Sequence, residues 1–413
     1  MTNESWTLSV GVDCGSRHHE VCVLNQSGQT VATRRIEHSG ADLHALTEWL
    51  LTLGESQPAR ILIGIEVPHG PVVETLLERG YVVYAINPKQ LERFRDRYSA
   101  AGAKDDGRDA WVLASAVQSD RKAFRRVEVG DPQIIQLREL SRLDGELSEE
   151  LTRTTNRLRD QLQRYFPQLL QLCPAADEPW LWELLARAAT PAEARQCDVT
   201  ALEQLLKRAR IRRFTAAELH HVLGTRPLVV APGTVEAASL HVRVLLPRVQ
   251  LLHAQRTESA KQLKQALKRL THDSPGKGRE HHNVTILLSL PGVGIRIAST
   301  MLAEAAQPLK TRDYHGIRLL SGVAPVTRAS GKRRIVTMRY ACNERLRTAC
   351  HHWANVATQH DATARRHYRI LRQGGHTHPR ALRGVADRLL AVLFGMLKSD
   401  TLYDRQRPRR SAA

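Results

Sequence analysis

The chain has 413 residues and a formal net charge of +19, because 61 Lys and Arg residues stand against 42 Asp and Glu residues. A hydrophobic content of 42% indicates a globular chain, long enough for two or three domains, and excludes a disordered one. So large a positive excess indicates a polyanionic partner, nucleic acid first and an anionic membrane surface second. The longest apolar run, Leu389 to Leu397, is too short to cross a bilayer, so we expect no membrane protein.

The first third, residues 1–128, is predicted to be an α/β domain. Apolar or alternating segments predict strands at residues 8–14, 19–24, 30–36, 61–65 and 81–86, and helical spacing predicts helices at residues 41–53 and 72–79. Gln26 to Gly28 forms a hairpin turn between two of the strands. The order of three strands, helix, strand, helix, strand, helix indicates an antiparallel meander that leads into a parallel sheet.

Four acidic residues fall where such a sheet places active groups, beyond the carboxyl ends of its strands. Asp13 and Glu66 end predicted strands, while Asp106 and Asp109 lie three residues apart at the start of a predicted helix and so share one face. Each alone has an ordinary explanation as a turn former, a solvated acid or a complement to the helix dipole. Together they favour a metal site, because clustered carboxylates need cations, and two Mg²⁺ ions about 4 Å apart would clamp a phosphodiester.

This order of strands and acids resembles a ribonuclease H-like nuclease fold, with the DEDD arrangement of the Holliday-junction resolvase RuvC. Asp13-Cys14-Gly15-Ser16 also looks like the first phosphate loop of actin-like ATPases and sugar kinases. That alternative is disfavoured because no second Gly-rich phosphate loop of that type follows Glu66.

The middle of the chain, residues 129–285, is predicted to be a long helical pair with an insert. Leucines recur at threes, fours and sevens from about residue 131 to 166, where Pro167 ends the helix, and again from 235 to about 270. We expect a coiled coil that serves as a spacer and dimerisation arm, with Pro247 kinking or breaking its second helix. Short helices are expected at residues 180–188, 201–208 and 216–222 in an inserted subdomain at about residues 172–231.

The last third, residues 286–413, is predicted to be mostly helical and to bind phosphate. Pro-Gly-Val-Gly at residues 291–294 resembles a helix-hairpin-helix turn, whose glycines let backbone amides approach a phosphate. Seven basic residues and one acid, Glu344, lie between Pro325 and Thr348, which makes this the most concentrated candidate for binding a nucleic-acid backbone: Arg328, Lys332, Arg333, Arg334, Arg339, Arg345 and Arg347.

Ser330 lies among these cations and precedes Gly331. A serine in that position is usually a turn residue. A serine flanked by arginines can also attack a phosphodiester, because guanidinium groups stabilise the charge that develops on phosphorus.

With these motifs the chain resembles the bridge-RNA-guided, DEDD-type insertion-sequence transposases, family one-hundred-and-ten of the insertion sequences. The resemblance is densest toward the two ends, in VGVDCGS, GIEVPHG, INPKQ and KDDGRDA, and then in LPGVG, SGVAPVTRASGK and RLLAVLFGMLKSD. It implies a RuvC-like site in which Asp13, Glu66, Asp106 and Asp109 bind Mg²⁺, with Mn²⁺ as a substitute. It also implies that Ser330, in a C-terminal transposase domain, is the nucleophile.

The resemblance further implies recombination of donor and target DNA through a 5′-phosphoserine link, with both DNAs chosen by a structured non-coding bridge RNA. Family members work as tetramers, so we expect a homodimer that assembles into a homotetramer through the coiled coil. Six cysteines without CxxC spacing, and an N-terminus without a signal-peptide pattern, indicate a cytoplasmic protein. The resemblance to transposases implies that it acts at the nucleoid.

Two other hypotheses remain open from the residues. The first is a metal-dependent, structure-selective RuvC-like nuclease, in which water is the nucleophile and Ser330 is only a turn residue. The second is a non-catalytic nucleic-acid-binding protein, in which the acids serve as helix caps. The first would form no covalent link to DNA, and the second would bind unchanged with Asn in place of Asp106 or Asp109.

Overall fold

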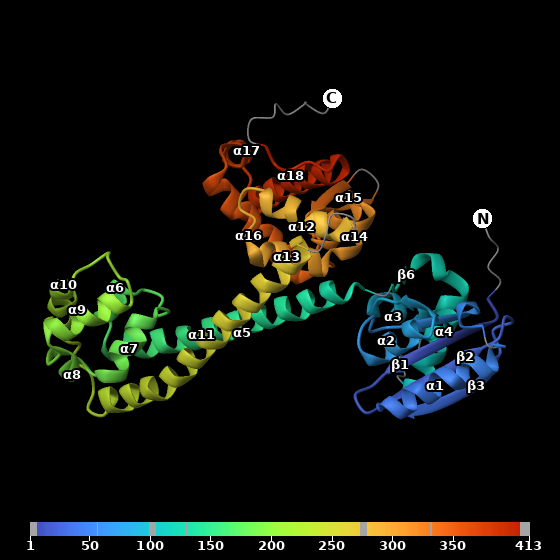
Figure 1. Cartoon of the computed structure of the whole chain (residues 1–413), viewed down its shortest axis with the longest axis horizontal. Coiled ribbons are helices and arrows are strands. Elements are labelled where there is room, and N and C mark those ends of the chain that lie inside the picture. Colours follow the sequence, from blue (N-terminus) through green and yellow to red (C-terminus); the bar gives the residue numbers. More distant parts are fainter. Residues whose placement is uncertain are drawn as a thin grey trace. The chain divides into compact units, whose positions relative to one another are not determined.

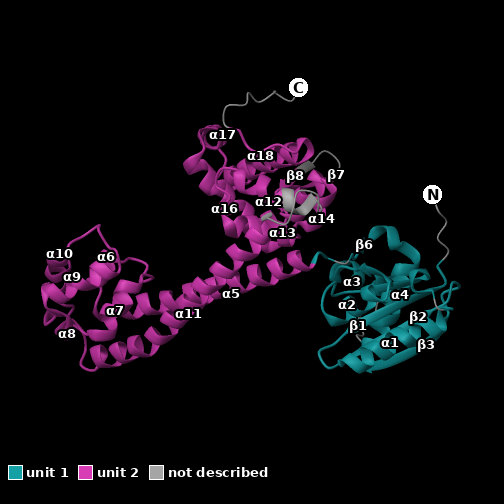
Figure 2. Cartoon of the chain, viewed as in Figure 1, with its two compact units in different colours: residues 1–131 teal, residues 132–413 magenta. Residues whose placement is uncertain are grey.

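The computed structural model describes residues 6–55, 57–98, 105–128, 130–272, 279–330 and 333–404. The chain divides into two compact units, residues 1–131 and 132–413, which Figure 2 shows in separate colours. We describe each unit by itself. None of the described helices combines the length and the apolar character that a membrane span requires.

The first unit is built on a six-stranded sheet. Its strand order is β3-β2-β1-β4-β5-β6, in which β1, β2 and β3 pair antiparallel, β1, β4 and β5 pair parallel, and β6 pairs antiparallel with β5. This mixed sheet is consistent with the ribonuclease H-like fold expected from the sequence, and only the short β6 was not predicted. The strands are β1 (Leu8–Cys14), β2 (His18–Leu24), β3 (Thr30–Glu37), β4 (Ile61–Ile65), β5 (Val82–Ala85) and β6 (Arg125–Arg126).

Helices cover both faces of this sheet (Figure 1). Helices α1 (Gly40–Leu53) and α2 (Pro71–Glu78) pack on the face that receives Val10 and Val12 of β1. Helices α3 (Pro88–Tyr98) and α4 (Asp106–Asp120) cover the opposite face through Ile86, Leu91 and Leu113. Alternate residues of β2, β4 and β5 therefore enter different cores on the two faces.

Two glycines allow α4 to lie directly on the sheet. Gly11 of β1 and Gly64 of β4 are register partners, so they lie side by side. A Cβ atom at Gly11 would lie 1.8 Å from the carbonyl oxygen of Ala110, and one at Gly64 would lie 2.6 Å from that of Leu113. Only glycine permits this approach of backbone to backbone, which fixes the height of α4 above the sheet.

The second unit is organised around two long helices, α5 (Pro132–Tyr165) and α11 (Thr234–His272), which pack along each other (Figure 1). They run antiparallel. The start of α5 and the end of α11 enter one hydrophobic core, with Leu137 and Leu267, whereas their other halves enter a second core, with Leu158 and Val242. This confirms the expected helical pair, while a coiled-coil supercoil stays a prediction.

Pro247 lies inside α11 without ending it. We expected it to kink or break this helix, since proline lacks an amide hydrogen. Its ring is exposed, while the flanking Leu246 and Val249 are buried in the core. The helix therefore continues through the proline without a break, while a kink at this position stays a prediction.

Between α5 and α11, five short helices form a subdomain around Trp180 and Trp182, both buried. Capping boxes at Thr190 and Thr215 start two of these helices. Helices α7, α9 and α10 occupy the positions expected from the sequence. The five are α6 (Leu169–Leu172), α7 (Pro179–Arg187), α8 (Pro191–Arg195), α9 (Val199–Arg208) and α10 (Ala216–Gly224).

The remainder of the second unit is mostly helical and shares one core with the adjoining ends of α5 and α11. Its β7–β8 hairpin was not predicted. The elements are α12 (Arg279–Ser289), α13 (Ile295–Glu304), α14 (Ala306–Thr311), α15 (Tyr314–Leu320), β7 (Val326–Ser330), β8 (Arg333–Thr337), α16 (Glu344–His360), α17 (Ala362–Gln373) and α18 (His378–Ser399).

Candidate functional site

Asp13 and Glu66 lie at the carboxyl ends of two adjacent parallel strands. Val12 of β1 pairs with Ile65 of β4, so the two acids occupy the next position along each strand, and both are half-buried. Burial, and after it the charges of Asp13 and Glu66, raise the pKa of the neighbouring Cys14 thiol to about 12. The structure therefore brings both carboxylates within electrostatic reach of one thiol, at one edge of the sheet.

Helix α4 carries the other two acids. It begins at Asp106, which is exposed and makes no hydrogen bond or ion pair with a described residue. Asp109 is buried, and the residue after it, Ala110, rests on Gly11, two positions before Asp13. The glycine contact therefore holds Asp109 close to the strand end that carries Asp13.

Arg95 of α3 binds Asp109 through two hydrogen bonds. Its Nε lies 2.5 Å from Oδ1 of Asp109 and its Nη2 lies 2.7 Å from Oδ2, so both carboxylate oxygens accept from one guanidinium group. We did not predict a role for Arg95 from the sequence. A signal was present, because Arg95 lies four residues after the buried Leu91 and therefore shares the inner face of α3.

Three of the four acids are placed where they could bind a divalent cation. Carboxylate oxygens are the ligands that Mg²⁺ prefers, and Asp13, Glu66 and Asp106 supply them at or near one sheet edge. Both oxygens of Asp109 already accept from Arg95, so a cation at Asp109 would share these oxygens with Arg95 or displace it. In the part of the chain that the structure describes, these four acids are not gathered into a group of three ligand atoms within 4.8 Å of one another.

One such group lies elsewhere, in the subdomain, and consists of Cys173, Asp177 and Glu178. Glu178 already accepts hydrogen bonds from Arg213 and from the indole of Trp180. Burial and then the charge of Glu178 raise the pKa of the Cys173 thiol to about 11, so the thiolate that a metal requires is disfavoured. The group therefore offers a possible acidic metal-binding site with a poor donor set.

Ser330 is the last residue of β7 and is exposed. It pairs with Arg333 across the hairpin, next to the pair of Ala329 with Arg334. Lys332 and the side chains of Arg333 and Arg334 lie outside the described residues. Arg328, on the same strand, is exposed as well. The hairpin therefore presents the serine and at least one cation to solvent.

The other predicted phosphate-binding arginines have different surroundings. Arg345 donates to the carbonyl of Ser141 at 2.6 Å and lies 3.5 Å from the carboxylate of Glu304, which joins α16 to α5 and α13. Arg347 pairs with Glu344 at 3.1 Å. Arg339 is half-buried, and its Nε has no hydrogen-bond partner among the described residues. The contacts of Arg345 therefore join three helices, whereas those of Arg347 are local to the start of α16.

The Pro-Gly-Val-Gly turn joins α12 to α13. Gly292 has a φ of 81°, and a Cβ atom there would lie 2.8 Å from the backbone nitrogen of Ala357 in α16. Trp353 also donates to the carbonyl of Pro291 at 3.0 Å. Gly292 therefore serves the packing of the turn against α16, while Gly294, at the start of α13, stays open to solvent.

We compared the chain with known protein families and with curated proteins. Residues 10–167 match the model for DEDD transposases of IS110 type, described as "Transposase", and residues 284–369 match the model described as "Transposase IS116/IS110/IS902 family". The first match contains all four acids, and the second contains Ser330 and the basic residues around it.

Several curated relatives are similar to this chain. It is 49% identical to the putative transposase y4uE of Sinorhizobium fredii over 207 residues, which are 50% of this chain and 58% of that protein. It is 30% identical to the mini-circle putative transposase for IS117 of Streptomyces coelicolor over 98% of both chains, and 27% identical to an insertion element IS110 protein of the same species over 97% of this chain. By two matching family models and a relative aligned along nearly its whole length, the chain belongs to the IS110 family of insertion-element transposases.

Proposed function

We propose that this transposase cuts and rejoins DNA through a 5′-phosphoserine intermediate formed on Ser330, assisted by metal bound at the acids of the first unit. The observation that carries the proposal is the strand-end pair of Asp13 and Glu66, with α4 fixed above it by two glycines, inside the region that matches the DEDD family. The exposed position of Ser330 at the end of β7 supports the second part.

The reaction consists of two phosphoryl transfers. The Ser330 hydroxyl loses its proton and its oxygen attacks the scissile phosphorus, forming a phosphoserine ester at the 5′ end and releasing a 3′-hydroxyl that takes up a proton. A 3′-hydroxyl of the partner duplex then attacks the same phosphorus and releases the serine. Arg328 and the neighbouring Lys332, Arg333, Arg334 and Arg339 would stabilise the charge on the phosphate.

Asp13, Glu66 and Asp106 would hold Mg²⁺ or Mn²⁺, joined by Asp109 once Arg95 has released it. When bound, the metal supplies positive charge to the scissile phosphate and to the oxygens that enter and leave. The positions of the acids would determine where that positive charge lies. Because α4 and the strand ends hold the acids in place, they would also limit where the phosphate can bind.

The partners proposed are donor DNA, target DNA and a structured bridge RNA that selects both by base pairing. A charge of +19 supports a protein that holds several polyanions at once. We propose a homodimer that pairs into a homotetramer along α5 and α11, in which the hairpin of one protomer serves the acids of another.

Covalent trapping tests this proposal. Purified protein with its co-purified RNA is incubated with Mg²⁺ and labelled duplex carrying the ends of its own insertion element, then run on a denaturing gel. We expect a DNA-linked band in the wild type and in Thr327→Ala, an exposed hydroxyl on the same strand, but none in Ser330→Ala or Asp106→Asn. Cleavage by Ser330→Ala without an adduct would instead establish a nuclease that uses water, and binding without any cleavage would establish a non-catalytic protein.

A further inference from the structure

The outer face of α17 carries a row of arginines that the proposed chemistry does not use. Residues that lie three, four, seven, eight and eleven positions after a given residue share its face of a helix. Six residues of α17 with this spacing line an open hollow of about 380 Å³: Ala362, Arg365, Arg366, Arg369, Ile370 and Gln373. The opposite face enters the core through Ala364, Tyr368 and Leu371. The packing of α17 therefore leaves its basic face in solvent.

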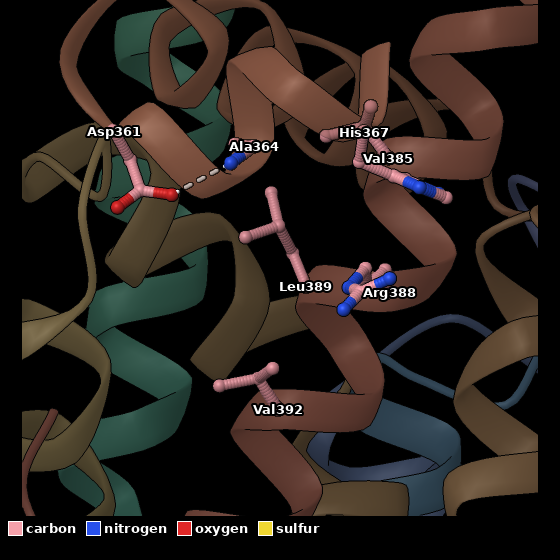
Figure 3. Close-up of a pocket in the computed structure, with 7 residues that line it drawn as sticks. All are labelled: Asp361, Ala364, His367, Val385, Arg388, Leu389 and Val392. Carbon is pink, nitrogen blue, oxygen red and sulfur yellow. Dashed lines mark hydrogen bonds between the residues drawn. The ribbon is translucent and has the colours of Figure 1, made fainter. Parts of the chain in front are cut away.

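The cavity on the inner side of α17 is too small for a ligand. It lies against α18, as Figure 3 shows, with Asp361 bonded to the amide of Ala364 and with His367 and Leu389 on its walls. Its volume is about 10 Å³, the space of a single water molecule. A partner of α17 must therefore contact its outer face.

Charges near the row are almost all positive. Residues 361–399 contain seven arginines and two acids, Asp361 and Asp387. Asp387 accepts two hydrogen bonds from Arg318, at 2.7 and 2.8 Å, and Asp361 is buried at the start of α17. Burial and then the positive charge of Arg380 lower the pKa of Arg383, which reflects the same crowding of cations.

The arginines of the row differ in how they are held. Arg365 donates to the carbonyls of Thr358 and Gln359 in the last turn of α16, which fixes its position. Arg366 and Arg369 are exposed and make no hydrogen bond or ion pair with any residue that the structure describes. A cluster of exposed guanidinium groups with no acid on the same face repels itself, and an anion that binds there relieves this repulsion. Arg366 and Arg369 therefore indicate an anionic partner, to which each guanidinium can donate in a bidentate manner.

We propose that this face of α17, through Arg366 and Arg369 with Arg365 beside them, binds the phosphate backbone of the DNA on which the transposase acts. The three arginines span about 6 Å of helix, on a face of about 16 Å from Ala362 to Gln373. Such an extended face suits a continuous polyanion better than a single small anion. DNA is chosen because transposases act on it, so the choice of ligand rests on the proposed function. Contacts to phosphates position a duplex without reading its sequence.

Salt-dependent binding of the full-length protein to a 30-base-pair duplex of arbitrary sequence tests this proposal, with fluorescence anisotropy as the readout. The double variant Arg366→Gln/Arg369→Gln should bind at least tenfold more weakly at low salt, and its slope of log K against log [salt] should fall by about 2, because each lost phosphate contact removes about 0.9. The matched control Arg210→Gln/Arg212→Gln removes two exposed arginines of the inserted subdomain, outside α5 and α11, and should leave the slope unchanged.

Equal losses in both double variants would show an effect of net charge alone and overturn the proposal. A loss confined to an RNA duplex of the same sequence would overturn the assignment to DNA. This binding assay is independent of covalent trapping at Ser330. If an adduct forms but the α17 variant binds DNA normally, only the inference about α17 is wrong. If the α17 variant binds DNA more weakly but no adduct forms, only the proposed serine chemistry is wrong. Circular dichroism checks that the variants fold.

Discussion

Arg95 and Asp109 meet through two parallel hydrogen bonds, of 2.5 and 2.7 Å, inside the first unit. The side chain of Asp109 is 2% exposed and that of Arg95 is 27% exposed. A buried carboxylate without a cation would be costly, so the guanidinium group compensates a charge that the fold has removed from water. A divalent cation could compensate the same charge. If Asp109 binds the proposed metal, the cation and Arg95 would therefore compete for the role of neutralising this carboxylate.

Replacing Arg95 by Ala should make the first unit less stable and more responsive to metal. Without divalent cations, the free energy of unfolding should fall by about 3 kcal/mol, because Asp109 is left buried and unpaired. Addition of Mn²⁺ should restore more stability to Arg95→Ala than to the wild type. Urea titrations in EDTA and in Mn²⁺ measure both effects. Arg93→Ala, an exposed arginine on the same helix, should change neither, and an equal response of all three proteins to Mn²⁺ would argue against competition.

Gly11→Ala should disturb α4 and the acids that it carries. The new Cβ would collide with the carbonyl oxygen of Ala110, so the helix must move away from the sheet at a cost of about 3 kcal/mol. Thermal unfolding measures the loss. Gly40→Ala is the matched control, since a Cβ there meets nothing within 4 Å in a helical first turn. Comparable stability of the two variants would show that α4 does not depend on this contact.

Glu304→Gln should weaken the junction between α5, α13 and α16. The carboxylate of Glu304 lies 3.3 Å from Arg142 and 3.5 Å from Arg345, and it accepts from Asn343 at 2.8 Å, while only 7% of its side chain is exposed. Loss of its charge should lower the free energy of unfolding by about 2 kcal/mol.

The control for this prediction is Glu344→Gln. That side chain is 79% exposed and pairs with Arg347 on the surface, so its loss should cost less than about 0.5 kcal/mol. Chemical denaturation of both variants gives the comparison. Similar costs would mean that the buried network contributes no more than a surface ion pair.

Alkaline pH should destabilise the second unit partly through Cys350. Burial raises the pKa of this thiol from 9.0 to about 12, so between these values the unfolded chain loses a proton that the folded chain keeps. Stability should therefore fall as pH rises above 9, with this group contributing about 1.4 kcal/mol per pH unit. Urea unfolding at pH 9.5 and 10.5 should show a shallower decline in Cys350→Ala. Leu346→Val, a buried change on the same helix, should lower stability equally at both pH values.

The sequence predicted the sheet and the place of two acids because both follow from local patterns. Apolar strands separated by turn residues specify β1 to β5, and parallel pairing then brings the ends that carry Asp13 and Glu66 together. Asp106 and Asp109 were placed correctly at the start of α4 by their spacing. Their role as metal ligands stays a prediction.

Other features depend on contacts between distant residues and could not be predicted. The exposed pattern of β7 lacks the alternation of a half-buried strand, so its hairpin gave no periodic signal. Arg345 was grouped with phosphate-binding residues by composition, but its partner Glu304 lies on another helix. Arg95 likewise meets Asp109 only after α3 and α4 have packed together.

The antiparallel pair of α5 and α11 has a consequence for how the family can vary in length. The helices contain 34 and 39 residues, so they span about 51 and 58 Å at 1.5 Å per residue. Because the two ends enter different cores, a single residue inserted in one helix would rotate everything beyond it by about 100° and pull buried leucines out of register. Insertions of about seven residues, matched in both helices, would keep the buried faces aligned, whereas three or four residues would require local over- or underwinding. The separation of the two cores is therefore expected to change in steps of about two helical turns.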